Sequence, residues 1–210
     1  SKVKDVVIDF GNNNFNSTSS YTGVFAGGVS KSEIENITVK NISELKGKTY
    51  LGGLVGLVSH SKIKNSTVSI GKVSAAENTS YQNLVTPQGD CAEGAFVGGG
   101  FGSVDKDSVI DNVQVTATEV SVEEGKGPYV GGLIGFNRGN IYSSSSKTNL
   151  IKGAHFVGGL IGMNLSDEAN SHGKIHYSSA SNGSYISGWK YVGGLIGSSG
   201  RVLGLETDLP

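Results

Sequence analysis

A seven-residue motif that occurs six times is the feature that most constrains the fold of this sequence. Its first position is Tyr or Phe, its third and seventh positions are glycine, and its second, fifth and sixth positions are mostly Val, Leu or Ile. The copies begin at Tyr21, Tyr50, Phe96, Tyr129, Phe156 and Tyr191, which are 29, 46, 33, 27 and 35 residues apart. The glycines at positions three and seven are Gly23, Gly27, Gly52, Gly56, Gly98, Gly102, Gly131, Gly135, Gly158, Gly162, Gly193 and Gly197. Such self-similarity predicts short structural units that stack on one another.

The motif also explains an unusual glycine content. The chain has 33 glycines in 210 residues, and the six copies hold 18 of them. Three prolines and the absence of a three-residue glycine period exclude collagen and argue against a Pro/Gly-rich disordered chain. A glycine within a strand lets another backbone approach closely, so the motif glycines are interpreted as structural positions.

The segments between the motifs have strand-like patterns. An Ile-x-Asn sequence recurs at 34–36, 63–65 and 110–112, and it is followed by short stretches with alternating apolar and polar residues. Each unit of about 30 residues therefore holds about three strands and is too small to bury its own apolar face. We expect an all-β, right-handed parallel β-solenoid of about six to seven three-stranded rungs. One rung starts near each motif copy, and 1–210 form a single domain.

The three asparagines of the Ile-x-Asn sequences are Asn36, Asn65 and Asn112. Asparagine tolerates the left-handed backbone conformation and hydrogen-bonds its own backbone. These residues are predicted to form a hydrogen-bonded ladder at one corner of the solenoid.

Two features could contact a partner. The six aromatic residues that open the motif copies would form a ladder. Either other parts of the chain bury this ladder, or it is exposed and offers an interaction surface. The longest interval between copies contains an insertion at 77–95, which is either a binding loop or a tolerated polar loop. The sequence leaves both pairs of alternatives open.

Charge and cysteine content exclude several classes of protein. With 17 Lys and Arg against 18 Asp and Glu, the formal charge is −1, which provides no net electrostatic footprint for nucleic acid. Cys91 is the only cysteine, so neither an intrachain disulfide nor a cysteine metal cluster can form. The sequence contains no run of about 18 apolar residues, the length that a helix needs to span a bilayer.

The sequence offers no recognisable catalytic, cofactor or metal site. His172 and His176 would stand about 13 Å apart on a strand, too far to share a metal. Glu33, Glu35, Asp111 and Glu123 are isolated along the chain, although carboxylates from different rungs could still form a pair of the kind that glycosidases use. We expect no enzyme activity and no cofactor.

The copies at Tyr129–Gly135 and Phe156–Gly162 are followed by one residue and then by Asn137 or Asn164. In this form the motif resembles the GLUG motif, and the resemblance extends from about 21 to 197. GLUG motifs occur in large bacterial secreted and surface proteins, including the N-terminal regions of immunoglobulin A1-specific zinc metallopeptidases and hemagglutinin-like adhesins. Those peptidases carry zinc in a separate domain, whose His-Glu-x-x-His signature is absent from this sequence.

The resemblance implies a non-catalytic repeat module of a bacterial protein that is secreted or held at the cell surface or cell wall. We expect a rigid scaffold that recognises a host protein, such as immunoglobulin, or a surface glycan, beside neighbouring domains of a larger chain. The candidate partner surface is the six aromatic residues that open the motif copies. One alternative is the substrate-docking region of an immunoglobulin A1 protease, and another is a polysaccharide-active enzyme built on a β-helix.

Overall fold

The structure is a computed structural model of the chain, and it describes 1–75, 95–122, 129–166 and 173–201. Within these ranges the chain forms twenty β-strands and no helix. The insertion predicted at 77–95 lies outside the described residues, except for the buried Ala95. The assignment of the whole chain to one domain stays a prediction.

Three parallel sheets make up the fold, and one of them, sheet A, consists of long strands. Its first strands are β1 (Lys2–Asn16), β4 (Glu33–Gly47), β7 (Lys62–Ala75) and β10 (Val109–Ser121). We call the strands that one passage of the chain contributes to the three sheets a level. At the fifth level the long strand is divided into β13 (Asn140–Tyr142) and β14 (Ser145–Lys152), and at the sixth into β17 (Ile175–His176) and β18 (Ser179–Ser187). Sheet A therefore provides the broadest surface of the molecule.

The motif copies build the other two sheets. Sheet B contains β2 (Tyr21–Gly23), β5 (Tyr50–Gly52), β8 (Phe96–Gly98), β11 (Tyr129–Gly131), β15 (Phe156–Gly158) and β19 (Tyr191–Gly193). Sheet C contains β3 (Ala26–Ser30), β6 (Val55–Ser59), β9 (Phe101–Val104), β12 (Ile134–Asn137), β16 (Ile161–Ser166) and β20 (Ile196–Arg201). Every strand of sheet B begins at the first residue of a motif copy, as the sequence predicts.

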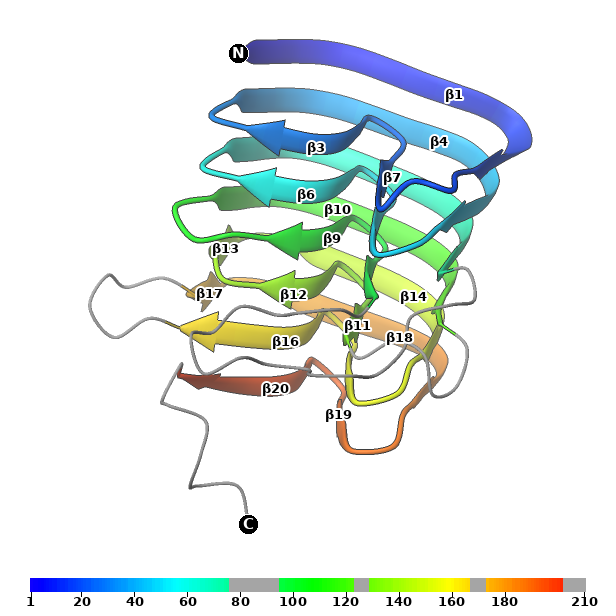
Figure 1. Cartoon of the computed structure of the whole chain (residues 1–210), viewed down its shortest axis with the longest axis vertical. Helices are drawn as coiled ribbons and strands as arrows, with labels where there is room; N and C mark the ends of the chain where they lie inside the picture. The colour runs from blue at the N-terminus through cyan, green and yellow to red at the C-terminus, as the bar shows by residue number, and fades with distance from the viewer. Residues whose placement is uncertain (76–94, 123–128, 167–172, 202–210) are drawn as a thin grey trace.

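The chain passes from sheet A to sheet B and sheet C and then returns to sheet A one level further along (Figure 1). The expected parallel β-solenoid with three strands per turn is confirmed. The predicted six to seven rungs are slightly too many, because six successive strands of a sheet are joined by about five complete turns. The right-handed winding stays a prediction.

The apolar core fills the space between the three sheets. Along β4 the inward side chains Ile34, Ile37 and Val39 are fully buried, while outward neighbours such as Thr38 are more exposed. Motif positions two and five, such as Leu51 and Leu54, are buried against them. The aliphatic positions of the motif therefore face the interior, and the aromatic first position lies on the opposite face of sheet B.

The corner between sheets B and C requires glycine. A Cβ atom on Gly131 would overlap the carbonyl oxygen of Ile134 and would lie 2.8 Å from the nitrogen of Gly162. At Gly132 it would overlap the carbonyl oxygen of Gly159, one level further along. Real Cβ atoms essentially never approach other atoms within 3.0 Å, so the interpretation of the motif glycines as positions of close backbone approach is confirmed.

We expect Gly132→Ala to destabilise the protein by about 2–3 kcal/mol, because the backbone of the next level must move to admit the methyl group. Gly194 occupies the same motif position in the last level, and a Cβ atom there meets nothing within 4 Å. Gly194→Ala is therefore the matched control and should change stability by less than about 0.5 kcal/mol. Chemical denaturation of the two variants measures this difference, and equal losses would contradict the corner mechanism.

Candidate functional site

The six aromatic residues that open the motif copies form one continuous stack along sheet B. Ring centroids of successive residues lie 4.8, 4.7, 5.1, 5.1 and 4.9 Å apart from Tyr21 to Tyr191, and all the pairs are stacked nearly face to face. Each inner ring thus uses both of its faces to contact its neighbours. The register of the glycine corners is what aligns the rings.

Other parts of the chain cover the middle of this aromatic ladder. Phe136 packs edge-on against Phe96 and Tyr129, and Leu165 belongs to the same cluster. Tyr129 is only 1% exposed, whereas Tyr21, at the N-terminal end of the ladder, is 47% exposed. Self-coverage accounts for the centre of the ladder, and its role as a partner surface stays a prediction.

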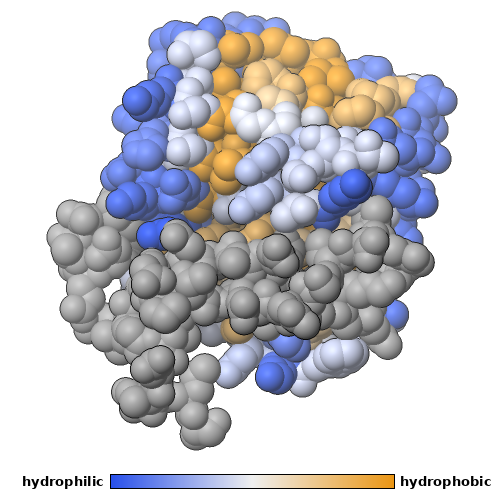
Figure 2. Space-filling model, viewed as in Figure 1, coloured by the Kyte–Doolittle hydropathy of each residue, from blue (hydrophilic) through white to orange (hydrophobic). Residues whose placement is uncertain are grey.

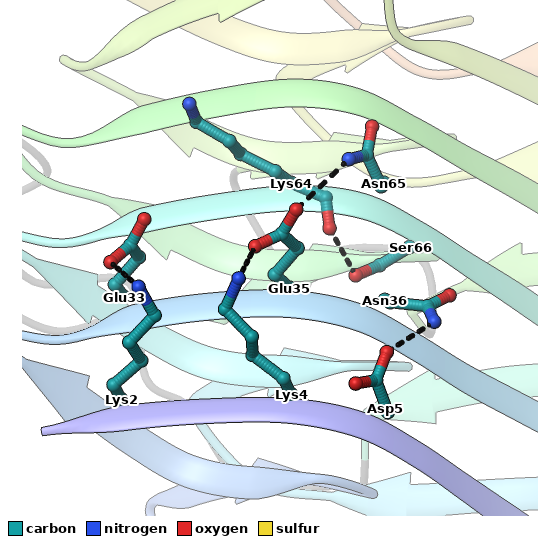
Figure 3. Close-up of polar contacts among 9 residues, drawn as sticks. All are labelled: Lys2, Lys4, Asp5, Glu33, Glu35, Asn36, Lys64, Asn65 and Ser66. Carbon is teal, nitrogen blue, oxygen red and sulfur yellow. Dashed lines mark hydrogen bonds and ion pairs between the residues drawn. The ribbon is translucent and has the colours of Figure 1, made fainter.

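A corner within sheet A carries a column of residues in the left-handed backbone conformation. Its members are Asp5, Asn36, Asn65, Asn112, Ser143 and Tyr177, with φ values between 47° and 58°. Asn112 Nδ2 donates to Asn65 Oδ1 at 2.9 Å, and Asn36 Nδ2 donates to Asp5 Oδ1 at 2.6 Å. Asn65 Nδ2 instead reaches Glu35 Oε1 at 3.5 Å (Figure 3). The predicted asparagine ladder is therefore confirmed in part: the three residues share the left-handed corner, but only Asn112 and Asn65 are hydrogen-bonded to each other.

A buried serine often follows the left-handed residue, and sequence reasoning missed it. Ser66 Oγ accepts the backbone N–H of Ile37 at 3.1 Å and donates to the carbonyl oxygen of Lys64 at 2.8 Å. Ser144 does the same for Val113 and Tyr142. The serines satisfy backbone groups that the corner removes from the regular strand ladder. The serine directly after Asn65 was a signal for this role.

A second amide ladder lies inside sheet C, at the asparagines that follow the GLUG-like copies. Asn137 is fully buried and donates both to the carbonyl oxygen of Gly139, at 2.9 Å, and to Asn164 Oδ1, at 2.7 Å. Asn164 donates to the carbonyl oxygen of Gly173 at 2.9 Å. These side chains close the turns that leave sheet C, so their role is structural.

The outer face of sheet A carries charges of alternating sign. Lys4, Glu35, Lys64 and Asp111 occupy one column in register, and Lys4 pairs with Glu35 (Figure 3). In the neighbouring column Lys2 Nζ lies 3.0 Å from Glu33 Oε2. Opposite charges on adjacent strands favour this register over one that would place like charges together.

These ion pairs change the pKa values of two glutamates that the sequence offers as candidate catalytic acids. Hydrogen bonding from Lys2 lowers the pKa of Glu33, and hydrogen bonding from Lys4 lowers the pKa of Glu35. A general acid at neutral pH needs a raised pKa, so neither carboxyl suits that role. Glu123 lies outside the described residues, and so does His172, while His176 stacks on Tyr142 at 5.6 Å. Within the described ranges no group of three His, Cys, Asp or Glu side chains could hold a metal ion.

A shallow groove of about 560 Å³ crosses the outer face of sheet A. Its lining residues are Asn12, Asn41, Ile42, Ser43, Ser69, Ile70, Gly71, Thr116, Ala117, Thr118, Lys147 and Asn149. It forms where the strand register shifts between Val39 and Ile42. A Cβ atom on Gly71 would overlap the carbonyl oxygen of Ser43, so a side chain is excluded there. Sequence reasoning missed this groove because a register shift leaves no repeated pattern.

The groove is polar and rich in hydroxyl groups. Ser69, Thr116 and Lys147 are exposed and lie side by side on β7, β10 and β14. Thr118 and Asn149 lie two residues further along β10 and β14 and form a second row of polar side chains beside the first. No carboxylate is present among the described residues that line it. The groove can therefore donate and accept hydrogen bonds with a polar ligand without repelling an anionic one.

The fold and these ladders define a parallel β-solenoid whose turns are set by a glycine-rich repeat. The GLUG motif family model matches 47–74, which covers β5, β6 and all but the last residue of β7, so the resemblance seen in the sequence is confirmed. The match indicates a repeat module of a larger protein. No curated protein and no solved structure matches the chain. Over the described ranges no helix is long and apolar enough to cross a membrane.

The exposed ion pairs of sheet A predict a loss of stability in acid. The pKa values of Glu33 and Glu35 are lowered in the folded state, so their contribution is present above the unfolded pKa of about 4 and is lost as pH falls through the folded values. We expect the melting temperature to fall as the pH drops below about 5, and to fall less in Lys4→Met, which removes the main cause of the Glu35 shift.

Lys62→Met is the control, because Lys62 lies on the same face and forms no ion pair within the described part of the chain. Thermal melts across this pH range compare the three proteins. An unchanged pH dependence in Lys4→Met would contradict the assigned cause.

Proposed function

We propose that this chain is a non-catalytic repeat module that binds glycans through the groove on sheet A. The observation that carries the proposal is the row of exposed hydroxyl and ammonium groups at Ser69, Thr116 and Lys147, with the amide of Asn149 in the adjacent row. Sugar hydroxyls need partners that both donate and accept hydrogen bonds, and these side chains supply both. The protein that contains the module is proposed to be a bacterial protein that is secreted or displayed at the cell surface or cell wall, on the basis of the GLUG match to 47–74.

The solenoid supports binding by holding these groups in place. Ser69, Thr116 and Lys147 stand on adjacent hydrogen-bonded strands, so they are about 4.8 Å apart along the solenoid axis. An extended polysaccharide that runs along this axis would meet a polar group at every level. Because the sheet already fixes the backbone, binding must order only the side-chain rotamers and not the backbone that carries them.

Two of the candidate carboxyl groups support the proposal that the module is not an enzyme. Glu33 and Glu35 are paired with Lys2 and Lys4, and their pKa values are lowered. Hydrolysis of a glycosidic bond needs one carboxyl group with a raised pKa beside a second, ionised one. A polysaccharide-active enzyme is therefore the weaker reading.

Recognition of a host protein, such as immunoglobulin, is the second candidate. Exposed aromatic side chains near the C-terminal levels favour it, namely Tyr177, Tyr185 and Trp189. Aromatic residues are enriched at protein interfaces. A docking region of an immunoglobulin A1 protease would use this kind of surface, beside a catalytic domain elsewhere in a larger chain.

Glycan binding is tested with a panel of neutral and acidic polysaccharides, measured by calorimetry or on an array. Lys147→Ala combined with Thr116→Ala should weaken binding by about tenfold or more, because about 1.4 kcal/mol of hydrogen bonding is lost. Lys62→Ala removes a positive charge from sheet A outside the groove and should leave the affinity unchanged.

Equal losses in both proteins would assign the binding to general charge rather than to the groove. Absence of binding to every glycan would contradict the proposal. If Trp189→Ala then abolished binding to immunoglobulin, the second candidate would replace it. Cleavage of a glycan by the purified chain would instead favour the enzyme.

A further inference from the structure

Among the described residues that line the groove on sheet A, Lys147 is the only one with a charged side chain. Its register neighbours on the adjacent strands are Thr116 on β10 and Ser181 on β18, and both have neutral side chains. Ser145 and Asn149, which face the same way on its own strand, are neutral as well. The ammonium group of Lys147 therefore stands among hydroxyl and amide groups.

The carboxylates that directly follow groove residues along their strands are already paired with other lysines. Lys72 Nζ lies 3.2 Å from Glu119 Oε1, and Lys46 Nζ lies 3.3 Å from Glu44 Oε2. Lys147 forms no ion pair with any residue that the structure describes. The groove therefore contains one positive charge that its surroundings do not compensate.

The groove offers no flat apolar surface on which a sugar ring could stack. Its described lining residues include no aromatic side chain, and they all belong to strands of sheet A. Figure 2 shows apolar surface elsewhere, over the upper levels of sheet C. Affinity in the groove must then come mainly from hydrogen bonds and charge. An anionic acceptor at Lys147 adds the attraction of opposite charges to the hydrogen bond that a neutral acceptor would make.

The neutral side chains around Lys147 can hold the sugar that bears an anionic group. Thr116 and Ser69 continue the row of Lys147 on the next two strands, about 4.8 Å apart. Thr118 and Asn149 lie in the second row beside them. Hydroxyl and amide groups both donate and accept hydrogen bonds, as sugar hydroxyls require. The arrangement suits a single carboxylate or sulfate group that is surrounded by sugar hydroxyls.

We propose that the glycan bound in this groove is acidic, and that a carboxylate or sulfate group on one sugar pairs with Lys147 while sugar hydroxyls bond to Thr116 and Ser69. This inference rests on the proposed glycan-binding function and narrows it to one class of ligand. The formal charge of the whole chain is −1, so the selectivity must come from the local ammonium group rather than from net charge.

Matched pairs of oligosaccharides test the proposal by calorimetry in low salt. Oligogalacturonate is compared with its methyl ester, and sulfated dextran oligosaccharides are compared with the unsulfated form, so that each pair differs mainly in charge. An acidic member should bind about fivefold more tightly than its neutral form. Lys147→Met should remove this preference, because it keeps most of the side chain and loses the charge, whereas Lys147→Arg should retain it.

Lys62→Met is the matched control variant. Lys62 is exposed on sheet A, lies outside the groove and forms no ion pair within the described ranges, so this variant should bind each oligosaccharide like the wild type. Both substituted lysines are exposed, and the melting temperature of each variant should be unchanged. The logarithm of the binding constant should fall against the logarithm of salt concentration with a slope of about −1 or shallower, as expected for one ammonium group.

Oligoglutamate separates recognition of an acidic sugar from attraction to any anion. It carries carboxylates without sugar hydroxyls, so it should bind at least about tenfold more weakly than the acidic oligosaccharide. Equal binding of oligoglutamate, or equal losses in Lys147→Met and Lys62→Met, would overturn the proposal. Neutral forms that bind as tightly as the acidic ones would also overturn it and would leave glycan binding in place. Absence of binding to every glycan would instead contradict the proposed function itself.

Discussion

The close approach of backbones at the corner between sheets B and C is the constraint on which the rest of this solenoid depends. Backbone N–H groups of one corner donate to carbonyl oxygens of the following corner, as from Gly53 to Gly99 at 3.1 Å and from Leu54 to Gly100 at 2.8 Å. A Cβ atom would overlap the carbonyl oxygen of the following level at Gly53, Gly99, Gly132 and Gly159. Among the six copies only the first departs from glycine at this motif position, with Val24. Two adjacent glycine positions therefore fix both the bend within a level and the distance to the next.

A fixed corner determines the register of every other position. Because the corners align, the aromatic residues stack within about 5 Å of one another and the left-handed asparagines of sheet A fall into one column. The same alignment brings charged residues of opposite sign next to each other on neighbouring strands of sheet A. Each ladder is weak as a single contact but repeats at every level, which is how a chain with a thin core gains rigidity.

Much of the fold follows from the sequence, because its signals recur at a fixed place in each unit. The six motif starts from Tyr21 to Tyr191 are the starts of the six strands of sheet B, and Asn36, Asn65 and Asn112 adopt the predicted left-handed conformation. The number of turns was slightly overestimated, since each motif copy was equated with a full rung. The number of motif copies equals the number of levels, whereas a complete turn of the solenoid joins one level to the next, so six levels make about five turns.

The candidate site was harder to predict, because it arises where repetition fails. The groove depends on a register shift between Val39 and Ile42 and on outward side chains such as Thr116 and Lys147, which vary from level to level. Burial of Tyr129 likewise depends on Phe136 and Leu165, which come from another sheet and from another level. Such contacts between sheets depend on the angle of the corner, and the residue pattern within one strand does not predict that angle.

Amide hydrogen exchange tests the central role of the glycine corners most directly. The amides of Gly53, Gly99, Gly132 and Gly159 bond to the next level at 3.1–3.3 Å, so they should exchange only through global unfolding and share one free energy of opening. The amide of Gly194, in the last level, should exchange much faster. Fast exchange at the four inner corners, with slow exchange in sheet A, would contradict the account, because the levels would then be held together without the corners.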